Sequence, residues 1–192
     1  MNTYPRIIAI CGLKRSGKDT IADYLCHTHN YTKVKIASPL KEGIKSIFGF
    51  TDEQLETDLK DVKDARWGVE PRKIMQHFGT EVMQYQLQDL IPNIGRSFWI
   101  KRLIDEHIVN SSEQRIVIPD LRFKHEYDML KEYGAIFWRV ERDIGNKHNC
   151  EHLSEREYLD IPVSAVYKND TLIDLYLQVE KQINNVNTNQ NL

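Results

Sequence analysis

Short apolar runs alternate along the chain with longer stretches in which apolar residues recur every three or four positions. The first run, residues 7–11, is apolar throughout and is bounded by Pro5 and Gly12. This pattern is expected of a strand that is buried on both faces of a parallel sheet. Further short strands are predicted on similar patterns at residues 33–36, 115–118, 135–140 and 165–167.

Helical periodicity occupies the segments between these strands. A helix start is expected at Ser38, which could cap it, with Pro39 in its first turn. A long helix is expected from Pro71 onward, because apolar side chains recur at helical spacing from Ile74 and Phe78. The other predicted helices cover residues 20–28, 98–109, 123–133 and 171–183.

Strands that alternate with helices predict a three-layer α/β fold with a mainly parallel sheet. We expect one domain, residues 1–185, with a helical part at about 38–110. Within that part, the highly charged residues 51–70 predict a helix and a mobile excursion. A polar segment without clear periodicity predicts a loop or lid at about 142–156. Residues 186–192 are expected to form a disordered tail.

Charge and cysteine content narrow the classes of function. The chain carries 26 Lys and Arg residues against 28 Asp and Glu, a formal net charge of −2. The basic excess typical of nucleic-acid-binding domains is missing, so we expect no direct nucleic acid binding. Three cysteines do not suit a disulfide-rich secreted domain. The N-terminal apolar run is too short for a signal sequence or a membrane span, so a cytoplasmic protein without membrane attachment is expected.

The sequence GLKRSGKDT, residues 12–20, follows the first predicted strand and precedes a predicted helix. Gly12 and Gly17 allow the backbone to curl with its N–H groups toward a phosphate, and Lys18 can reach the β and γ phosphates of a nucleotide. Three cations within five residues suit the charge of ATP. A glycine-rich turn with exposed cations is the alternative. The predicted ATP-binding residues here are Gly12, Lys14, Arg15, Ser16, Gly17, Lys18, Asp19 and Thr20.

Asp19 occupies the position after the loop lysine, where Ser or Thr usually offers a hydroxyl to Mg²⁺. A carboxylate can also coordinate this hard cation, directly or through its waters, so Asp19 is the predicted metal residue. Thr20 would still offer a hydroxyl and an N–H group near the α phosphate. Asp19 could instead be a first-turn acid that the helix dipole stabilises.

The loop resembles that of phage and viral deoxynucleoside monophosphate kinases, and its Lys-Asp pair is also similar to phosphomevalonate kinase. Other segments that resemble the first family follow in order and cover nearly the whole chain. They are ASPLKE (37–42), RKIMQHFGTE (72–81), GRSFWIK (95–101), PDLRFKHEYDMLKEYGA (119–135), RVERDIG (139–145) and EHLSE (151–155).

This resemblance implies a P-loop kinase fold and transfer of the γ-phosphoryl group of ATP, with Mg²⁺, to a deoxynucleoside 5′-monophosphate, giving the diphosphate and ADP. It also implies a homodimer. Some members of the family carry an insertion where this chain is compact, between residues 50 and 70, so the resemblance does not assign the accepted bases.

Positioning and charge neutralisation matter more to this reaction than a general base, because the acceptor phosphate oxygen is already ionised at neutral pH. Arg72, Gln76 and Thr80 share one face of the long predicted helix. Together with Lys41 and Arg96, this face is similar to the monophosphate pocket of the family, with Gln76 placed to read the base. Solvated surface cations are the alternative.

Asp120 and Arg122 follow the predicted strand at 115–118. Arg122 could contact the acceptor phosphate, and Asp120 could hold a water on Mg²⁺. A capped strand-to-helix turn is the alternative for Asp120.

Arg139 and Arg142 border the predicted lid. In the family, such a lid closes over the phosphates and brings in an arginine that stabilises the transferring group. Arg142 is predicted to act in this way with Lys18 and Arg15, because Arg139 lies within a strand pattern. The sequence KND, residues 168–170, follows the last strand and is predicted to line the adenine pocket, with Asn169 as the predicted ATP-binding residue.

The sequence HNCEH, residues 148–152, carries His148, Cys150 and His152 at alternate positions. Three side chains without a further Cys pair make a poor zinc site, so a role of His152 in ordering the lid is preferred. Two other functions stay open for the chain. They are a small-molecule kinase of the phosphomevalonate type and a nucleotide-binding switch without phosphotransfer.

Overall fold

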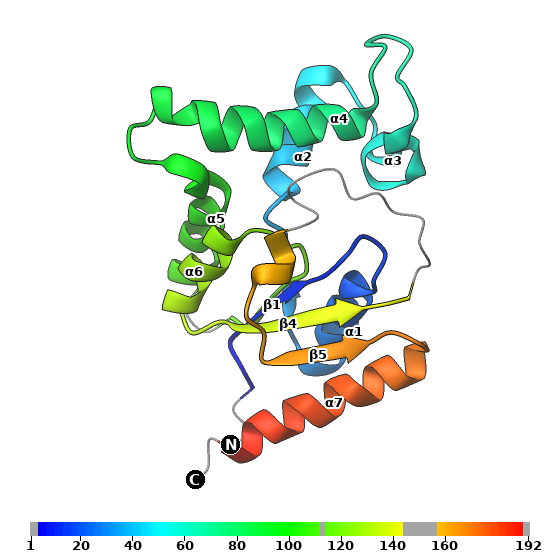
Figure 1. Ribbon diagram of the computed structural model, residues 1–192, viewed down its shortest axis with the longest axis vertical. Helices are drawn as coiled ribbons and strands as arrows, with labels where there is room; N and C mark the ends of the chain where they lie inside the picture. Colours follow the sequence, from blue (N-terminus) through cyan, green and yellow to red (C-terminus); the bar gives the residue numbers. More distant parts are fainter. Residues whose placement is uncertain (1–3, 112–113, 144–156, 190–192) are drawn as a thin grey trace. The chain divides into compact units, whose positions relative to one another are not determined.

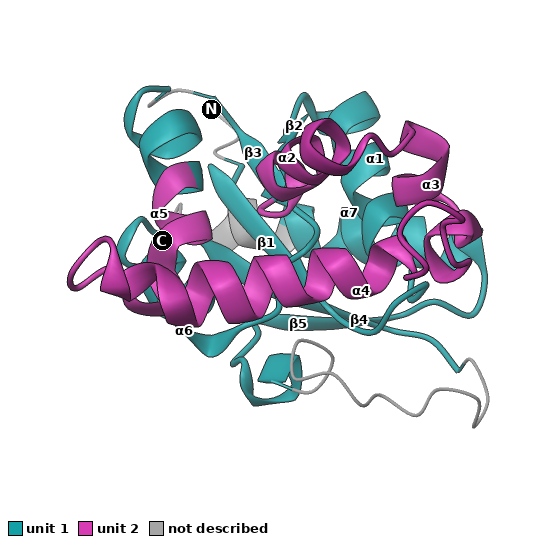
Figure 2. Ribbon diagram, turned by 90° about the horizontal axis from the view of Figure 1, so that it is seen from above, with its two compact units in different colours: residues 1–35, 103–192 teal, residues 36–102 magenta. Residues whose placement is uncertain are grey.

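A computed structural model describes residues 4–111, 114–143 and 157–189 of the 192-residue chain. The chain forms two compact units (Figure 2). Unit 1 consists of residues 1–35 and 103–192, and unit 2 consists of residues 36–102. The predicted lid at 142–156 falls almost entirely outside the described residues, as do His148, Cys150 and His152.

Unit 1 is built on a five-stranded sheet with the order β2-β3-β1-β4-β5. Every strand pair of this described sheet is parallel, and Ile8 of the central strand lies opposite Val117 on one side and Ile136 on the other. The central strand is fully buried, as its unbroken apolar sequence predicts. The strands are β1 (Ile7–Cys11), β2 (Thr32–Lys33), β3 (Ile116–Ile118), β4 (Ile136–Glu141) and β5 (Ala165–Lys168).

Helices cover both faces of the sheet. On one face, α1 (Lys18–His29) and α7 (Leu172–Asn189) share a hydrophobic core with Trp138 of β4, and α7 runs along β5 (Figure 1). The neighbouring Phe137 points to the opposite face, where it packs on Tyr127 of α6 (Lys124–Glu132) at a ring distance of 4.3 Å. The predicted three-layer α/β fold with a parallel sheet is confirmed.

Unit 2 is helical and has a small core of its own around Ile44, Phe50 and Leu55. The charged excursion has internal structure here, because the buried carboxylate of Asp64 accepts hydrogen bonds from Gln54 and Arg66. The helical segments from this unit to the next strand are α2 (Ser38–Phe48), α3 (Asp52–Glu56), η1 (Asp58–Asp61), α4 (Pro71–Gln76), the π-helical η2 (His77–Gln86), η3 (Leu87–Asp89), η4 (Gly95–Ser97), α5 (Phe98–Leu103) and the π-helical η5 (Ile104–Val109).

Helix α2 begins at Ser38 with Pro39 in its first turn, as predicted, but two expectations about helix ends are wrong. Ser38 does not cap α2, because Ala37 already has helical backbone angles and forms the N-cap without a side-chain hydrogen bond. The last helix continues to Asn189, whereas a disordered tail was expected from residue 186. Its polar C-terminal sequence is rich in Asn but contains neither Gly nor Pro, the strongest signals for a helix end. Residues 190–192 lie outside the described part of the chain.

A short 3₁₀ helix, η7 (Glu157–Asp160), precedes β5. Among the described residues, no helix combines the length and the apolar character that a membrane crossing requires.

Candidate phosphate-binding site

The loop between β1 and α1 has a backbone that its glycines make possible. Gly12 and Gly17 have φ values of 142° and 110°, and a Cβ atom at Gly12 would collide with the carbonyl oxygen of Val140. Arg15 is also left-handed, with a φ of 64°, and the N–H group of Ser16 donates to the carbonyl oxygen of Leu13 at 3.2 Å. Alternating backbone conformations of this kind turn successive N–H groups toward an anion.

Asn169 holds the loop from the far end of the sequence. Its side-chain Nδ2 donates to the carbonyl oxygen of Ser16 at 2.8 Å, and its own N–H group donates to Glu141 O at 2.8 Å. The side chain is buried, and a Cβ atom at Gly17 would collide with Nδ2. Glycine at position 17 is therefore required by contact as well as by its backbone angles.

Lys18 is the first residue of α1, and its ammonium group folds back over the loop. Its Nζ donates to the carbonyl oxygen of Leu13 at 2.6 Å. Burial lowers the pKa of Lys18 to about 8, and the positive charge of Arg122 acts in the same direction. An anion bound beside Lys18 would relieve both effects, so the site favours a negatively charged ligand.

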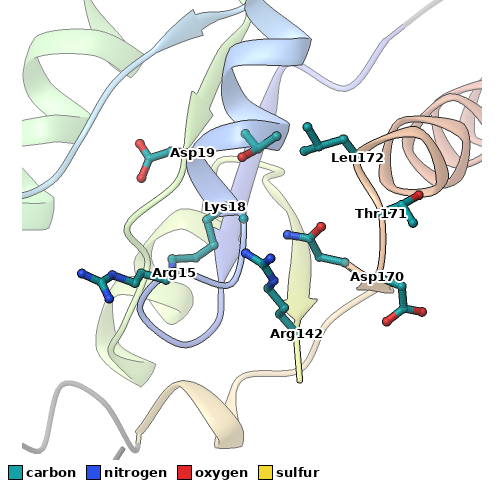
Figure 3. Close-up of a pocket in the computed structure, with 10 residues that line it drawn as sticks. Arg15, Lys18, Asp19, Arg142, Asp170, Thr171 and Leu172 are labelled. Atoms are coloured by element: carbon teal, nitrogen blue, oxygen red, sulfur yellow. The ribbon is translucent and has the colours of Figure 1, made fainter. Parts of the chain in front are cut away.

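A cavity of about 390 Å³ opens at this loop (Figure 3). Arg142 reaches it from the end of β4, and Asn169 reaches it from the end of β5. The lining residues belong to unit 1 and are Arg15, Gly17, Lys18, Asp19, Thr20, Arg142, Asn169, Asp170, Thr171 and Leu172.

Eight of these residues were predicted, and two, Thr171 and Leu172, were missed. Thr171 caps α7, since its Oγ1 accepts from the N–H group of Asp174 at 3.1 Å and donates to the Asp174 carboxylate at 2.7 Å. The T-x-x-D pattern was the sequence signal for this helix start. Gly12, Lys14 and Ser16 belong to the loop but are not among the residues that line the cavity. Arg139 has another partner, because its Nη2 donates to the carbonyl oxygen of Ile161 at 2.9 Å.

Asp19 projects to the side of the loop away from Arg142 (Figure 3). Its Oδ1 lies 2.6 Å from Nζ of Lys35 and 3.8 Å from Nζ of Lys33. Burial alone would raise the pKa of the Asp19 carboxyl, but the hydrogen bond and charge of Lys35, followed by the charge of Lys33, hold it below its ordinary value. Asp19 is therefore ionised at neutral pH.

The donor atoms at the loop fit Mg²⁺. Asp19 supplies a carboxylate and Thr20 a hydroxyl, and both line the same cavity. Within the described part of the chain, no group of three or more His, Cys, Asp or Glu side chains could hold a metal ion. An ion at the loop would therefore take most of its ligands from nucleotide phosphates and water, as Mg²⁺ commonly does.

The loop after β3 carries Asp120 and Arg122, and the charges of both act on Lys18. Glu126, which was not predicted, anchors this loop. Its Oε2 accepts from the N–H groups of Arg122 at 2.9 Å and Phe123 at 3.0 Å. Glu126 is 3% exposed, and burial raises the pKa of its carboxyl group to about 7. Phe123 precedes helix α6, and Glu126 lies three positions after it. An acid at this position is the usual sequence signal for such an anchor.

The predicted acceptor cations of unit 2 all have partners within that unit. Nε and Nη2 of Arg72 donate to the carboxylate of Asp61. Nζ of Lys41 donates to both carboxylate oxygens of Glu56, at 2.7 and 2.6 Å.

Arg96 donates from Nε to the amide oxygen of Gln84 at 3.2 Å, and its guanidinium carbon lies 5.5 Å from the ring centroid of Tyr85. Thr80 is buried, and Gln76 is partly buried on α4. All of these residues and contacts lie within unit 2.

A parallel sheet whose central strand runs into a glycine loop and a lysine-led helix defines a P-loop protein of the kinase type. A solved gluconokinase from Sinorhizobium meliloti shares this fold. It has a TM-score of 0.51 and 13% sequence identity, over 97% of this chain and 96% of that chain.

The sequence matches the profile of the deoxynucleotide monophosphate kinase family over residues 6–67 and 45–179, and the chain belongs to this family. It is 29% identical over 191 residues to a protein of Acanthamoeba polyphaga mimivirus provisionally named a deoxynucleotide monophosphate kinase, covering 93% of this chain and 96% of that protein. It is 24% identical over 218 residues to the deoxynucleotide monophosphate kinase of Enterobacteria phage T4, covering 78% of this chain and 86% of that protein.

The family predicted from the loop and its ordered downstream segments is thus confirmed, and the chain is a nucleotide kinase. Membership of this family implies ATP as the phosphoryl donor. The roles of individual residues stay predictions.

Proposed function

We propose that the chain transfers the γ-phosphoryl group of ATP to deoxynucleoside 5′-monophosphates, with Mg²⁺, and that the loop at residues 12–20 holds the donor phosphates. The observation that carries this division of roles is the cavity at the loop, which Lys18, Arg142 and Asp19 all line. It combines a left-handed glycine, three cations and an ionised carboxylate at one helix start, an arrangement that suits a metal-bound polyphosphate.

Charge neutralisation is the main task of the protein groups in this mechanism, because the acceptor oxygen needs no general base. Lys18 exchanges its bond to the Leu13 carbonyl oxygen for a phosphate oxygen, and the bound anion restores its full protonation. Arg142 and Arg15, which also line the cavity, add positive charge at the transferring group. Mg²⁺, when it is bound with the nucleotide, supplies further neutralisation, with Asp19 and Thr20 holding it directly or through water.

Binding of the acceptor phosphate is assigned to cations whose present acidic partners a ligand can replace. Arg72 and Lys41 are held by Asp61 and Glu56 in the structure. A monophosphate dianion, like a carboxylate, offers a pair of oxygens that Arg can bind bidentately, so it can replace either acid. The full proposed acceptor set is Lys41, Arg72, Gln76, Thr80, Arg96, Asp120 and Arg122.

A coupled assay of ADP release tests the proposal. The purified protein is incubated with MgATP and each of dTMP, dGMP, dCMP, dAMP, the four ribonucleoside monophosphates and mevalonate 5-phosphate. We expect release with at least one deoxynucleotide and none with mevalonate 5-phosphate. Binding of ATP without ADP release in the presence of any acceptor would instead indicate a nucleotide-binding switch.

Three further predictions concern assembly and environment. A homodimer, a cytoplasmic location and the lack of direct nucleic acid binding are all expected. Light scattering and a DNA-binding titration check the first and the last.

A further inference from the structure

Lys35 is paired with the residue that makes this phosphate loop unusual. Its Nζ lies 2.6 Å from Oδ1 of Asp19, and the two side chains are 29% and 57% exposed. Lys35 follows β2, an edge strand of the sheet, whereas Asp19 lies in the first turn of α1. The contact therefore joins two elements that are separate in the sequence.

Lys35 offsets the negative charge that Asp19 introduces at the loop. A hydroxyl at this position is neutral, whereas the carboxylate places a negative charge beside the binding site of a polyanion. Repulsion between like charges at short range weakens binding unless a cation offsets it. Lys35 supplies that cation and also holds the carboxylate to one side of the loop.

We propose that Asp19 and Lys35 act as one charge-neutral unit in place of the usual hydroxyl, and that Lys35 thereby sets the affinity of the loop for nucleotide without metal. Lys35 is a positioning residue in this proposal, because it acts through Asp19. The proposal rests on the proposed role of the loop in binding ATP.

Lys33 provides a matched control on the same segment of chain. Its side chain is 30% exposed, and its Nζ lies 2.5 Å from Oδ1 of Asp23 but 3.8 Å from Oδ1 of Asp19. Replacement of Lys33 by Met removes the same charge, two residues away, and leaves the close contact of Lys35 with Asp19 in place.

The experiment measures the Kd for ADP by titration calorimetry, once with excess EDTA and once with Mg²⁺. The proteins are the wild type, Lys35→Met, Lys35→Arg, Lys33→Met, Asp19→Ser and the double variant Asp19→Ser with Lys35→Met. Circular dichroism and thermal unfolding establish that each is folded.

We expect Lys35→Met to weaken binding of metal-free ADP about tenfold, because a close unpaired carboxylate then faces the phosphates. The loss should be smaller with Mg²⁺, since the metal offsets that charge. Asp19→Ser should tighten metal-free binding, whereas Lys35→Arg, Lys33→Met and the double variant should stay within about threefold of the wild type.

Three results would overturn this inference and leave the proposed function intact. They are wild-type affinity for ADP in Lys35→Met, an equal loss of affinity in Lys33→Met, and a double variant that binds ADP as weakly as Lys35→Met. The last would show that Lys35 does not act through Asp19. A wild-type protein that binds no ADP under either condition would contradict the proposed function as well, so the two failures are distinguishable.

Discussion

The phosphate loop of unit 1 and the acceptor cations of unit 2 differ in how their geometry is fixed. In the loop, the geometry is fixed by backbone conformation. Gly12 and Gly17 adopt angles that other residues avoid, and Asn169 bonds the main chain at Ser16. In unit 2, the cations are instead held by exchangeable side chains, as Arg72 is by Asp61. A preorganised backbone resists any change, whereas a paired side chain can give up its partner to a ligand.

This contrast predicts that single substitutions in the loop cause large losses of function, whereas substitutions among the unit 2 cations cause smaller, graded losses of acceptor binding.

Lys18→Ala should lower kcat by at least about 100-fold, because it removes the cation nearest the loop backbone at the transferring phosphate. The fold should remain, since burial of the Lys18 ammonium lowers its pKa and therefore opposes folding rather than supporting it. Steady-state kinetics and circular dichroism measure the two effects. Unchanged turnover would refute the proposed mechanism.

Gly17→Ala should weaken binding of an ATP analogue by about tenfold or more, since the new Cβ collides with Asn169 and the φ of 110° costs about 1–2 kcal/mol for alanine. Gly134→Ala is the matched control. Gly134 also has a positive φ, of 73°, but no atom lies within 4 Å of the added Cβ. The control should lose a similar stability to backbone strain but keep its nucleotide affinity. Equal affinities in both variants would show that the contact with Asn169 does not shape the loop.

Arg72→Ala should raise KM for the deoxynucleotide about 10-fold to 100-fold, in line with the loss of hydrogen bonds to a charged group. Asp61→Asn should act in the opposite direction and lower that KM, because it removes the carboxylate that competes for Arg72. KM for ATP should change little in either variant. If Asp61→Asn raised the acceptor KM as strongly as Arg72→Ala, Asp61 would be a support for Arg72 rather than a competitor.

The smallest expected effect is on pH dependence. Burial raises the pKa of Glu126 to about 7 from an ordinary 4.5, so the folded state binds more protons than the unfolded state between these values. The contribution of Glu126 to stability is thus greatest below pH 4.5 and is lost as the pH rises to 7. Glu126→Gln, which stays neutral, should flatten this part of the curve of unfolding free energy against pH. An unchanged slope would contradict the raised pKa.

Local sequence patterns predicted most of the fold and the phosphate loop. The apolar run before Gly12 is typical of a strand in a sheet interior, and the spacing of the glycines between this strand and the next helix predicts a phosphate loop. Lys35 could not be found in this way, because its role depends on a contact between separate elements. Glu126 had a local signal, its position three residues after Phe123, but its burial required the structure. Asn169 was predicted to line the adenine pocket, but its bond to Ser16 required the structure.

The helix boundaries show the same limit. A serine before a proline is a typical helix start, yet the backbone at Ala37 is already helical and leaves Ser38 inside the first turn. The π-helical register of η2 leaves no mark in the apolar spacing that predicted a helix from Pro71.

The bond between Asn169 and Ser16 spans 153 positions of the sequence. The loop leaves the ribosome before β5 does, but the side chain that locks it follows β5. A chain interrupted before β5 would carry every loop residue and still lack this lock. Nucleotide binding should therefore arise late in biosynthesis, after β4 and β5 have joined β1, and truncated chains should not compete with the finished enzyme for ATP.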